Sequence, residues 1–322
     1  MDQTRQAGRL FLIVVILFLT GSFILSIFAS NEDILQLYAL NALFISLFCM
    51  YVPALSFMKA HPDIDYGRNR ITFSQTMLSI LLGISAFLLS TGIGGFMSLL
   101  AETLGLPEMT APLPRMQGWR AIASVIVVCV VPAIAEEQLF RGVLLNAWRP
   151  FGRRKAILLS SVLFALMHGD PVAIPSVFAL AWLLGSLSYS TGSVYPSMTL
   201  HMTNNFIALV LNELLLQNSS LADSPAVSTG EALLTCSLYT CIGLLFTIIN
   251  YRKLVLSIRR SREEQAGERP PEPMQTPPSS DEGNGQKALT LPVVISLVLL
   301  LGLVALYFFS MTGKIALQFT GK

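Results

Sequence analysis

Long apolar stretches separated by short polar segments form the dominant pattern along the chain. A helix needs about 20 residues to cross a hydrocarbon layer of about 30 Å, and nine stretches approach or exceed that length. They are residues 10–29, 35–58, 76–100, 120–147, 155–169, 172–190, 194–216, 231–250 and 290–311. The fifth and sixth are short and separated by a turn at 168–171, so one broken hairpin is an alternative. The pattern predicts an all-α, polytopic transmembrane helix bundle.

Composition supports a membrane protein. Hydrophobic residues make up 53% of the chain and charged residues only 12%, whereas soluble domains are about a quarter charged. The formal net charge of +2 is too small to indicate a nucleic-acid partner. The four cysteines all lie in apolar stretches and predict neither a disulfide framework nor a metal-binding pair.

The distribution of basic residues predicts the orientation in the membrane. With nine spans and a cytoplasmic N-terminus, 16 of the 21 Lys and Arg residues fall on the cytoplasmic side and only four on the other. The first apolar stretch is longer than a signal-peptide core, and no A-x-A-like cleavage site follows it, so we expect a retained anchor. We therefore expect a multi-pass integral membrane protein with lipid as a partner.

The chain divides into four predicted parts. Residues 1–118 hold N-terminal transmembrane helices, and residues 119–250 form a core that contains the ionisable residues described below. Residues 251–289 begin basic and then become rich in Pro, Glu, Ser and Gly, which predicts a disordered linker. Residues 290–322 hold a C-terminal transmembrane helix. We expect about eight core helices in a compact bundle, with the last helix outside it on a flexible tether.

Three ionisable residues lie in the fourth apolar stretch: Glu136, Glu137 and Arg141. A charge at mid-bilayer costs about 2.5–3.5 kcal/mol on insertion scales, so each needs a reason to be there. Glu137 and Arg141 are four residues apart and can pair on one helical face, whereas Glu136 is rotated by about 100°. Pro132 removes a backbone hydrogen bond and can bend this helix toward water, although a proline tolerated by its neighbours explains it equally well.

Two of the three histidines, His168 and His201, lie in or at the edge of apolar stretches. Phe164 precedes His168 by four residues and Asn205 follows His201 by four, so each pair shares a helical face. At a rise of about 1.5 Å per residue, these side chains and those of the fourth stretch lie about 10–20 Å from the cytoplasmic helix ends. The depths predict one site that opens toward the cytoplasm.

These residues resemble the motifs of a known family. The three motifs, in order on successive spans, are Glu136-Glu137-x-x-x-Arg141, Phe164-x-x-x-His168 and His201-x-x-x-Asn205. They are similar to those of the CAAX protease and bacteriocin-processing (CPBP, or Abi) intramembrane endopeptidases. The resemblance covers about residues 120–210 and implies hydrolysis of a peptide bond in a membrane-anchored protein or peptide. The linker and the last helix lie outside the common core of that family.

The resemblance also implies a role for each motif residue. Glu136 is expected to act as a general base on water with the help of His168, while His201 and Asn205 donate hydrogen bonds to the oxyanion. Glu137, held by Arg141, is expected to orient the site together with Phe164. Bacterial relatives lead us to expect a bacterial cytoplasmic membrane.

The presence of a metal is left open by the sequence. Two histidines and two glutamates could form a zinc site with Glu136, His168 and His201 as ligands. However, no H-E-x-x-H motif is present, and a scattered Glu/His/His set serves equally well in a metal-free glutamate protease. We expect no cofactor and keep zinc as the alternative.

Two other functions fit the same residues. Buried Glu, His and Arg side chains also mark ion pathways, so a transporter or proton-coupled channel is one alternative. The other is a non-catalytic immunity or scaffold protein that keeps the fold without turnover.

Overall fold

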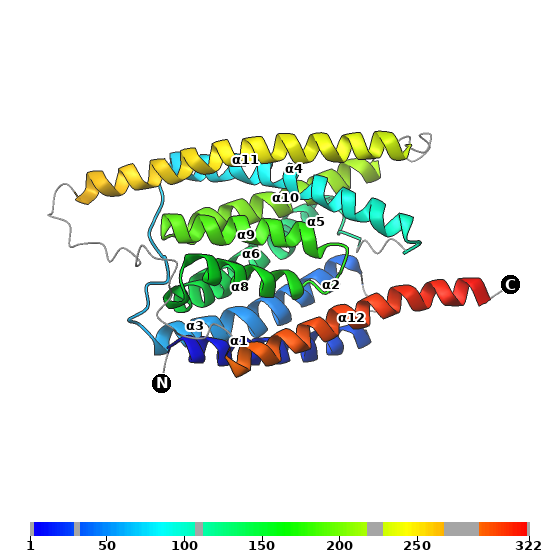
Figure 1. Cartoon of the computed structure of the whole chain (residues 1–322), viewed down its shortest axis with the longest axis horizontal. Coiled ribbons are helices and arrows are strands. Elements are labelled where there is room, and N and C mark those ends of the chain that lie inside the picture. The colour runs from blue at the N-terminus through cyan, green and yellow to red at the C-terminus, as the bar shows by residue number, and fades with distance from the viewer. Residues whose placement is uncertain (1–2, 29–32, 107–111, 218–227, 267–289, 321–322) are drawn as a thin grey trace.

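The fold is a bundle of long helices that run side by side, parallel or antiparallel to one another (Figure 1). The structure, a computed structural model, describes residues 3–28, 33–106, 112–217, 228–266 and 290–320. Within these residues every regular element is helical, which confirms the predicted all-α class.

Nine long helical runs and the three-residue 3-10 helix η5 build the part of the bundle that the structure describes, and two of the long runs alternate between α- and π-helical geometry. The elements are α1 (Gln3–Phe28); α2 (Ile34–Leu40), η2 (Asn41–Tyr51) and α3 (Val52–Ala60); α4 (Phe73–Thr103); α5 (Trp119–Ser124), η3 (Val125–Val130), α6 (Val131–Glu137), η4 (Gln138–Leu144) and α7 (Leu145–Ala147); η5 (Arg149–Phe151); α8 (Arg153–Leu166); α9 (Ile174–Thr191); α10 (Tyr195–Gln217); α11 (Thr229–Ala266); and α12 (Leu291–Thr320). The nine predicted stretches therefore coincide with these runs one by one.

Seven of these runs are long and apolar enough to cross a membrane among the described residues. The two that fall short are α8 and α10. Helix α8 has 14 residues, or about 21 Å, which is less than the hydrocarbon thickness. Helix α10 has 23 residues but carries the polar His201, Asn204 and Asn205. Helices α8 and α9 are joined by a turn, and α8 is too short to cross alone, so the alternative of one broken hairpin stays a prediction.

The turn between α9 and α10 sets the two helices side by side. Gly192 ends α9 in the left-handed conformation (φ 56°), and α10 begins three residues later. The Gly192 carbonyl accepts hydrogen bonds from Asn69 and from Arg262 near the end of α11. The start of α10 is therefore fixed at the end of the bundle where α11 finishes.

The predicted boundary of the linker is wrong at its start. Helix α11 continues to Ala266, so residues 251–266 are helical and not part of a disordered segment. The reason is that Leu254, Val255 and Ile258 occur at helical spacing within the basic stretch and are buried against α4 and α9. Residues 267–289, the rest of the predicted linker, lie outside the described residues.

The last helix is also better packed than expected. Val293 and Leu300 of α12 are buried in the main apolar cluster together with Phe11 of α1. A side chain at Gly8 of α1 would lie 3.1 Å from Val293, so the missing side chain allows the two helices to approach closely. The expectation that this helix stands outside the bundle is therefore wrong, because the first helix provides a matching apolar face.

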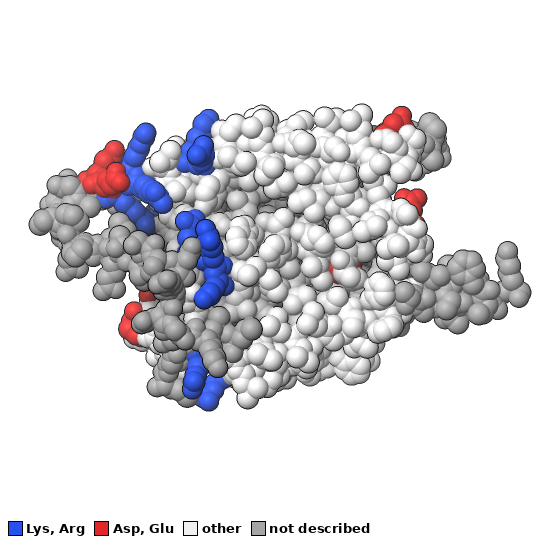
Figure 2. Space-filling view, viewed as in Figure 1, with Lys and Arg blue, Asp and Glu red and all other residues white. Residues whose placement is uncertain are grey.

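Charge is segregated along the helix axes. In Figure 2, Lys and Arg gather at one end of the molecule, the end where α1 begins and α11 finishes in Figure 1, while the rest of the face in view is mostly uncharged, with only small acidic patches. An apolar belt with a basic end is the pattern of a protein that crosses a membrane with that end in the cytoplasm. The molecule is therefore an integral, multi-pass membrane protein.

Candidate active site

A buried ion pair lies at the centre of the candidate site. The side chains of Glu137 and Arg141 are both 0% exposed, and Arg141 Nη1 donates to Glu137 Oε1 at 2.8 Å. Arg141 Nη2 donates to the main-chain oxygen of Ala181 on α9 at 3.1 Å, so the guanidinium also joins α9 to this centre. The predicted pairing of Glu137 with Arg141 is present, and the pair offsets the cost of burying either charge alone.

His201 of α10 lies between the two adjacent carboxylates. Its Nδ1 is 3.1 Å from Glu137 Oε1, and its Nε2 is 3.9 Å from Glu136 Oε2. An ionised carboxylate only accepts hydrogen bonds, so the Nδ1–H donates to Glu137 and the other ring nitrogen faces Glu136. Glu136 differs from its neighbour because its side chain is 18% exposed. The structure therefore brings Glu136, Glu137 and His201 together, as the depths predicted.

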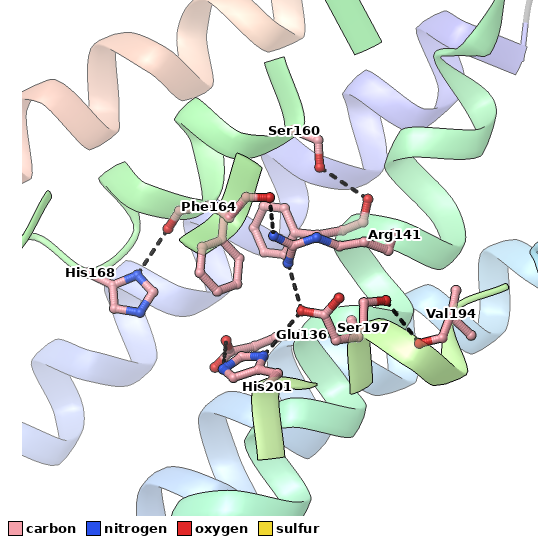
Figure 3. Close-up of polar contacts among 11 residues, drawn as sticks. Glu136, Arg141, Ser160, Phe164, His168, Val194, Ser197 and His201 are labelled. Carbon is pink, nitrogen blue, oxygen red and sulfur yellow. Dashed lines mark hydrogen bonds and ion pairs between the residues drawn. The ribbon is translucent and has the colours of Figure 1, made fainter. Parts of the chain in front are cut away.

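Phe164 forms the apolar wall between the polar groups (Figure 3). Its ring centroid lies 4.5 Å from the Arg141 guanidinium carbon, 5.0 Å from the His168 ring and 6.0 Å from the His201 ring. A guanidinium over an aromatic face is attracted by the ring quadrupole. The predicted orienting residue Phe164 thus contacts the arginine and both histidines.

His168 lies at the exposed side of the site. Its Nδ1 lies 3.0 Å from the main-chain oxygen of Phe164, one turn earlier, so this nitrogen carries the hydrogen and Nε2 has the lone pair. No hydrogen bond joins His168 to Glu136 among the described residues, and the Phe164 ring contacts both histidines (Figure 3). Any cooperation between His168 and Glu136 therefore requires a group or a water between them.

Asn205 lies one turn beyond His201 on α10. Its Nδ2 donates to the main-chain oxygen of Val128 at 3.2 Å, and its Oδ1 accepts from Asn204 Nδ2 at 3.4 Å. The amide is therefore already engaged with η3, in the same helical run as Glu136. This contact was not predicted, because a main-chain carbonyl has no signature in the sequence.

Asn146 is a further site residue that the sequence did not reveal. Helix segments η3 and η4 flank Glu136 and Glu137 with π-helical geometry, which displaces main-chain carbonyls from regular hydrogen bonding. The Asn146 side chain donates to the carbonyls of both Arg141 and Gly142 at 2.9 Å. The five-residue spacing between Arg141 and Asn146 is the only sequence feature that indicates this contact, and many unrelated residue pairs share it.

The side chains of the described site are not grouped as a set of metal ligands. Among the described residues, no three His, Cys, Asp or Glu side chains are grouped closely enough to hold a metal ion. The expected zinc ligands Glu136, His168 and His201 are not such a group. Glu137 is also committed to Arg141 and His201.

Fold and site together define a polytopic membrane protein with a buried, hydrogen-bonded Glu–Arg–His centre. Residues 118–207 match the model of one protein family, described as type II CAAX prenyl endopeptidase Rce1-like. This segment is therefore similar to the CAAX protease (CPBP/Abi) family that the three motifs indicated, and it contains all three motifs. Comparisons with curated proteins and with solved structures found no match.

Proposed function

We propose that the protein is an intramembrane endopeptidase that hydrolyses a peptide bond of a membrane-associated protein or peptide. The observation that carries the proposal is the position of His201 between Glu136 and Glu137, at 3.9 and 3.1 Å, inside the Rce1-like segment. A partly exposed carboxylate beside a buried imidazole provides a base and a hydrogen-bond donor for the same reacting carbonyl.

The two carboxylates have separate roles. Glu137 is fully buried and its Oε1 is shared by Arg141 and His201, so it serves to hold the imidazole in place. Glu136 is partly exposed and makes no ion pair with an arginine among the described residues, so its oxygens are free to take a proton from water. Neighbouring carboxylates in different surroundings commonly divide acid–base work in this way.

The reaction proceeds in two steps. Glu136 takes a proton from water, and the resulting hydroxide forms a bond to the scissile carbonyl carbon while the carbonyl oxygen becomes an oxyanion. Asn205 and His201 donate hydrogen bonds to that oxyanion, His201 as an imidazolium that keeps its Nδ1–H on Glu137 and donates through Nε2–H. His168 helps to hold the water. The carbon–nitrogen bond then breaks, and the proton held by Glu136 passes to the leaving amine. All atoms and charges are supplied by the substrate, one water and these side chains.

The name of the matched family suggests the substrate to try first. The purified full chain, reconstituted in proteoliposomes, is given a fluorescence-quenched peptide with a prenylated cysteine near its C-terminus. We expect cleavage at one bond, and we expect His168→Ala to lower kcat by at least about 100-fold, the usual contribution of acid–base groups. The matched control is His61→Ala, because His61 lies at the end of α3 and outside the site.

The same vesicles test the alternatives. A pH-sensitive dye inside them reports proton movement, which the peptidase proposal expects to be unaffected by Glu136→Gln. Proton flux that depends on Glu136, without any peptide cleavage, would replace the peptidase by a proton-coupled transporter. His168→Ala that cleaves as fast as His61→Ala would contradict the proposed chemistry.

Metal dependence is tested separately. Because the Glu and His side chains of the described site are not grouped as metal ligands, we expect turnover to continue after treatment with a strong chelator. Elemental analysis of the purified protein is expected to find no stoichiometric zinc. Loss of turnover on chelation, restored by added zinc, would contradict this expectation.

A further inference from the structure

The main-chain hydrogen bonds change register where the π-helical segment η4 ends. The N–H of Leu145 donates five residues back, to the Phe140 oxygen. The N–H of Trp148 donates only four residues back, to the Leu144 oxygen at 3.0 Å. Three carbonyls lie between these two acceptors, whereas only two N–H groups lie between the two donors. The backbone therefore has one donor fewer than the carbonyls of residues 141–143 need.

The side chain of Asn146 provides the missing donor. It is 7% exposed, and its Nδ2 donates to the main-chain oxygens of Arg141 and Gly142, at 2.9 Å each. An amide nitrogen carries two hydrogens, one for each of these carbonyls. A buried carbonyl without a donor is costly, above all in a membrane, so the amide stabilises the end of the π-helical segment.

Arg149 determines which way the Asn146 amide points. Its Nε donates to Asn146 Oδ1 at 2.8 Å. Because a guanidinium only donates, the amide oxygen faces Arg149 and the amide nitrogen faces the two carbonyls. The guanidinium carbon of Arg149 lies 4.9 Å from the ring centroid of Tyr189 on α9, where the aromatic face attracts it. Both ends of the Asn146 amide are therefore held.

Two arginines join this helical run to α9 in the same register. Arg141 donates to the Ala181 oxygen at 3.1 Å, and Arg149 contacts Tyr189. The two arginines are eight residues apart, and so are their two partners on α9. Asn146 bonds to both arginines, to the carbonyl of the first and to the guanidinium of the second. The amide therefore connects the two contacts with α9.

We infer that Asn146 is a positioning residue that acts through Arg141. By satisfying the carbonyls at the end of η4, it keeps Arg141 where its guanidinium reaches Glu137 at 2.8 Å. Glu137 in turn accepts from His201, the imidazole beside the proposed base. The effect of Asn146 on the reaction rests on the proposed function, whereas its hydrogen bonds are contacts of the folded protein.

Replacement of Asn146 tests the effect on the reaction. Asn146→Leu keeps the approximate size of the side chain and removes both donated bonds, so we expect kcat to fall about tenfold. KM is expected to stay unchanged, because the residue affects the geometry of the reacting groups and not the binding of the peptide. Asn146→Asp keeps an acceptor for Arg149 but has no N–H, and we expect a similar fall in kcat. The matched control is Asn41→Leu, at an exposed asparagine of η2, which is expected to leave kcat unchanged.

A double-mutant cycle tests whether Arg149 acts through Asn146. Arg149→Met removes the group that orients the amide, so we expect a fall in kcat of about fivefold. Adding Arg149→Met to Asn146→Leu is expected to change kcat by less than about twofold. The Arg153 guanidinium carbon also lies near the Tyr189 ring, 5.7 Å from its centroid, but Arg153 donates to Ser190. Arg153→Met is therefore the matched control and is expected to leave kcat unchanged in either background.

The same cycle on the thermal midpoint tests the contact without any activity. Arg149→Met is expected to lower Tm more in the wild-type background than in the Asn146→Leu background, where no amide oxygen accepts from Arg149. Arg153→Met is expected to change Tm equally in the two backgrounds. If Asn146→Leu does not fold, Asn146→Ala takes its place in both cycles.

The outcomes separate this inference from the proposed function. Coupling of Asn146 and Arg149 in both Tm and kcat supports it. A kcat of Asn146→Leu equal to that of Asn41→Leu, or a loss in KM alone, overturns it. Equal effects of Arg149→Met on Tm in the two backgrounds also overturn it. Coupling in Tm, with no cleavage by the wild type, supports the contact and overturns the proposed function.

Discussion

Adjacent residues with the same side chain have opposite surroundings at this site. Glu137 is 0% exposed and bonded to Arg141 and His201, while the side chain of Glu136 is 18% exposed. A rotation of about 100° per residue is enough to turn one carboxylate into the protein and the other toward the reaction. The chemical identity of the residues therefore matters less than the partners that the fold gives them.

Removal of the arginine is expected to destabilise the protein strongly. Arg141→Met leaves Glu137 as a buried charge without its partner, which costs about 3–5 kcal/mol in comparable sites. The free energy of unfolding in mild detergent measures the loss. The double variant Glu137→Gln/Arg141→Met is expected to recover most of the stability but not the activity, because the Nδ1–H of His201 loses its charged acceptor.

Arg153→Met is the matched control for this prediction. Arg153 is exposed and donates to Ser190, so its replacement is expected to cost less than about 1 kcal/mol. If Arg141→Met is as stable as Arg153→Met, the buried pair does not have the structural role assigned to it.

At the scale of elements, the position of α10 decides whether His201 and Asn205 reach the site. Helix α10 packs against α4 at Gly83, where a Cβ atom would lie 2.7 Å from Thr203 Cβ and 3.0 Å from the Leu200 oxygen. The absence of a side chain at this position is therefore what allows α10 to approach α4 so closely.

Gly83→Ala is expected to push α10 away from α4. We expect a loss of stability of about 1–3 kcal/mol from overpacking and a fall in kcat, since a displacement of about 1 Å at reacting groups can cost about 100-fold. Gly94→Ala is the control in the same helix, because its Cβ would meet Ser176 at 3.8 Å, an ordinary contact. Both changes raise helix propensity equally, so equal stabilities of the two variants would contradict the role of Gly83.

The sequence was sufficient to predict the helices and the motif residues, but it did not predict which side chains form contacts between helices that are distant in sequence. Glu137 and Arg141 could be paired from their spacing alone, because four residues make one helical turn. The Asn205–Val128 contact could not be foreseen, since it depends on how two distant helices pack. The helical residues 251–266 were missed because their few apolar side chains are sufficient for one packed face but too sparse to predict a core.

At the scale of the whole molecule, the site lies toward the basic end of the bundle. Helix α10 begins at that end, and His201 is six residues from its start, or about 9 Å. Further along the same face, Leu209 is fully buried, and Glu213 binds Arg115 at 3.3 Å and the Met116 N–H at 2.9 Å. The α10 face that carries His201 and Asn205 is therefore covered by protein contacts beyond Asn205, on the side away from the basic end.

The orientation of the molecule in the membrane is a prediction of the charge pattern. In a variant without native cysteines, Glu102→Cys at the end of α4 is expected to react with a membrane-impermeant maleimide added outside intact cells. Glu264→Cys near the end of α11 is expected to react only after the membrane is opened. The reverse labelling pattern would place the basic end outside and contradict the proposed topology.

The most direct test of the central claim is the rate of peptide cleavage by Glu136→Gln. The change removes one negative charge and the ability to accept a proton from water while keeping the size of the side chain. With a thermal midpoint close to that of the wild type, we expect kcat to fall by about 100-fold or more, whereas Glu102→Gln, at an exposed carboxylate of α4, leaves it unchanged. Cleavage by Glu136→Gln at the wild-type rate would show that this carboxylate is not the base and that the site does not work as described.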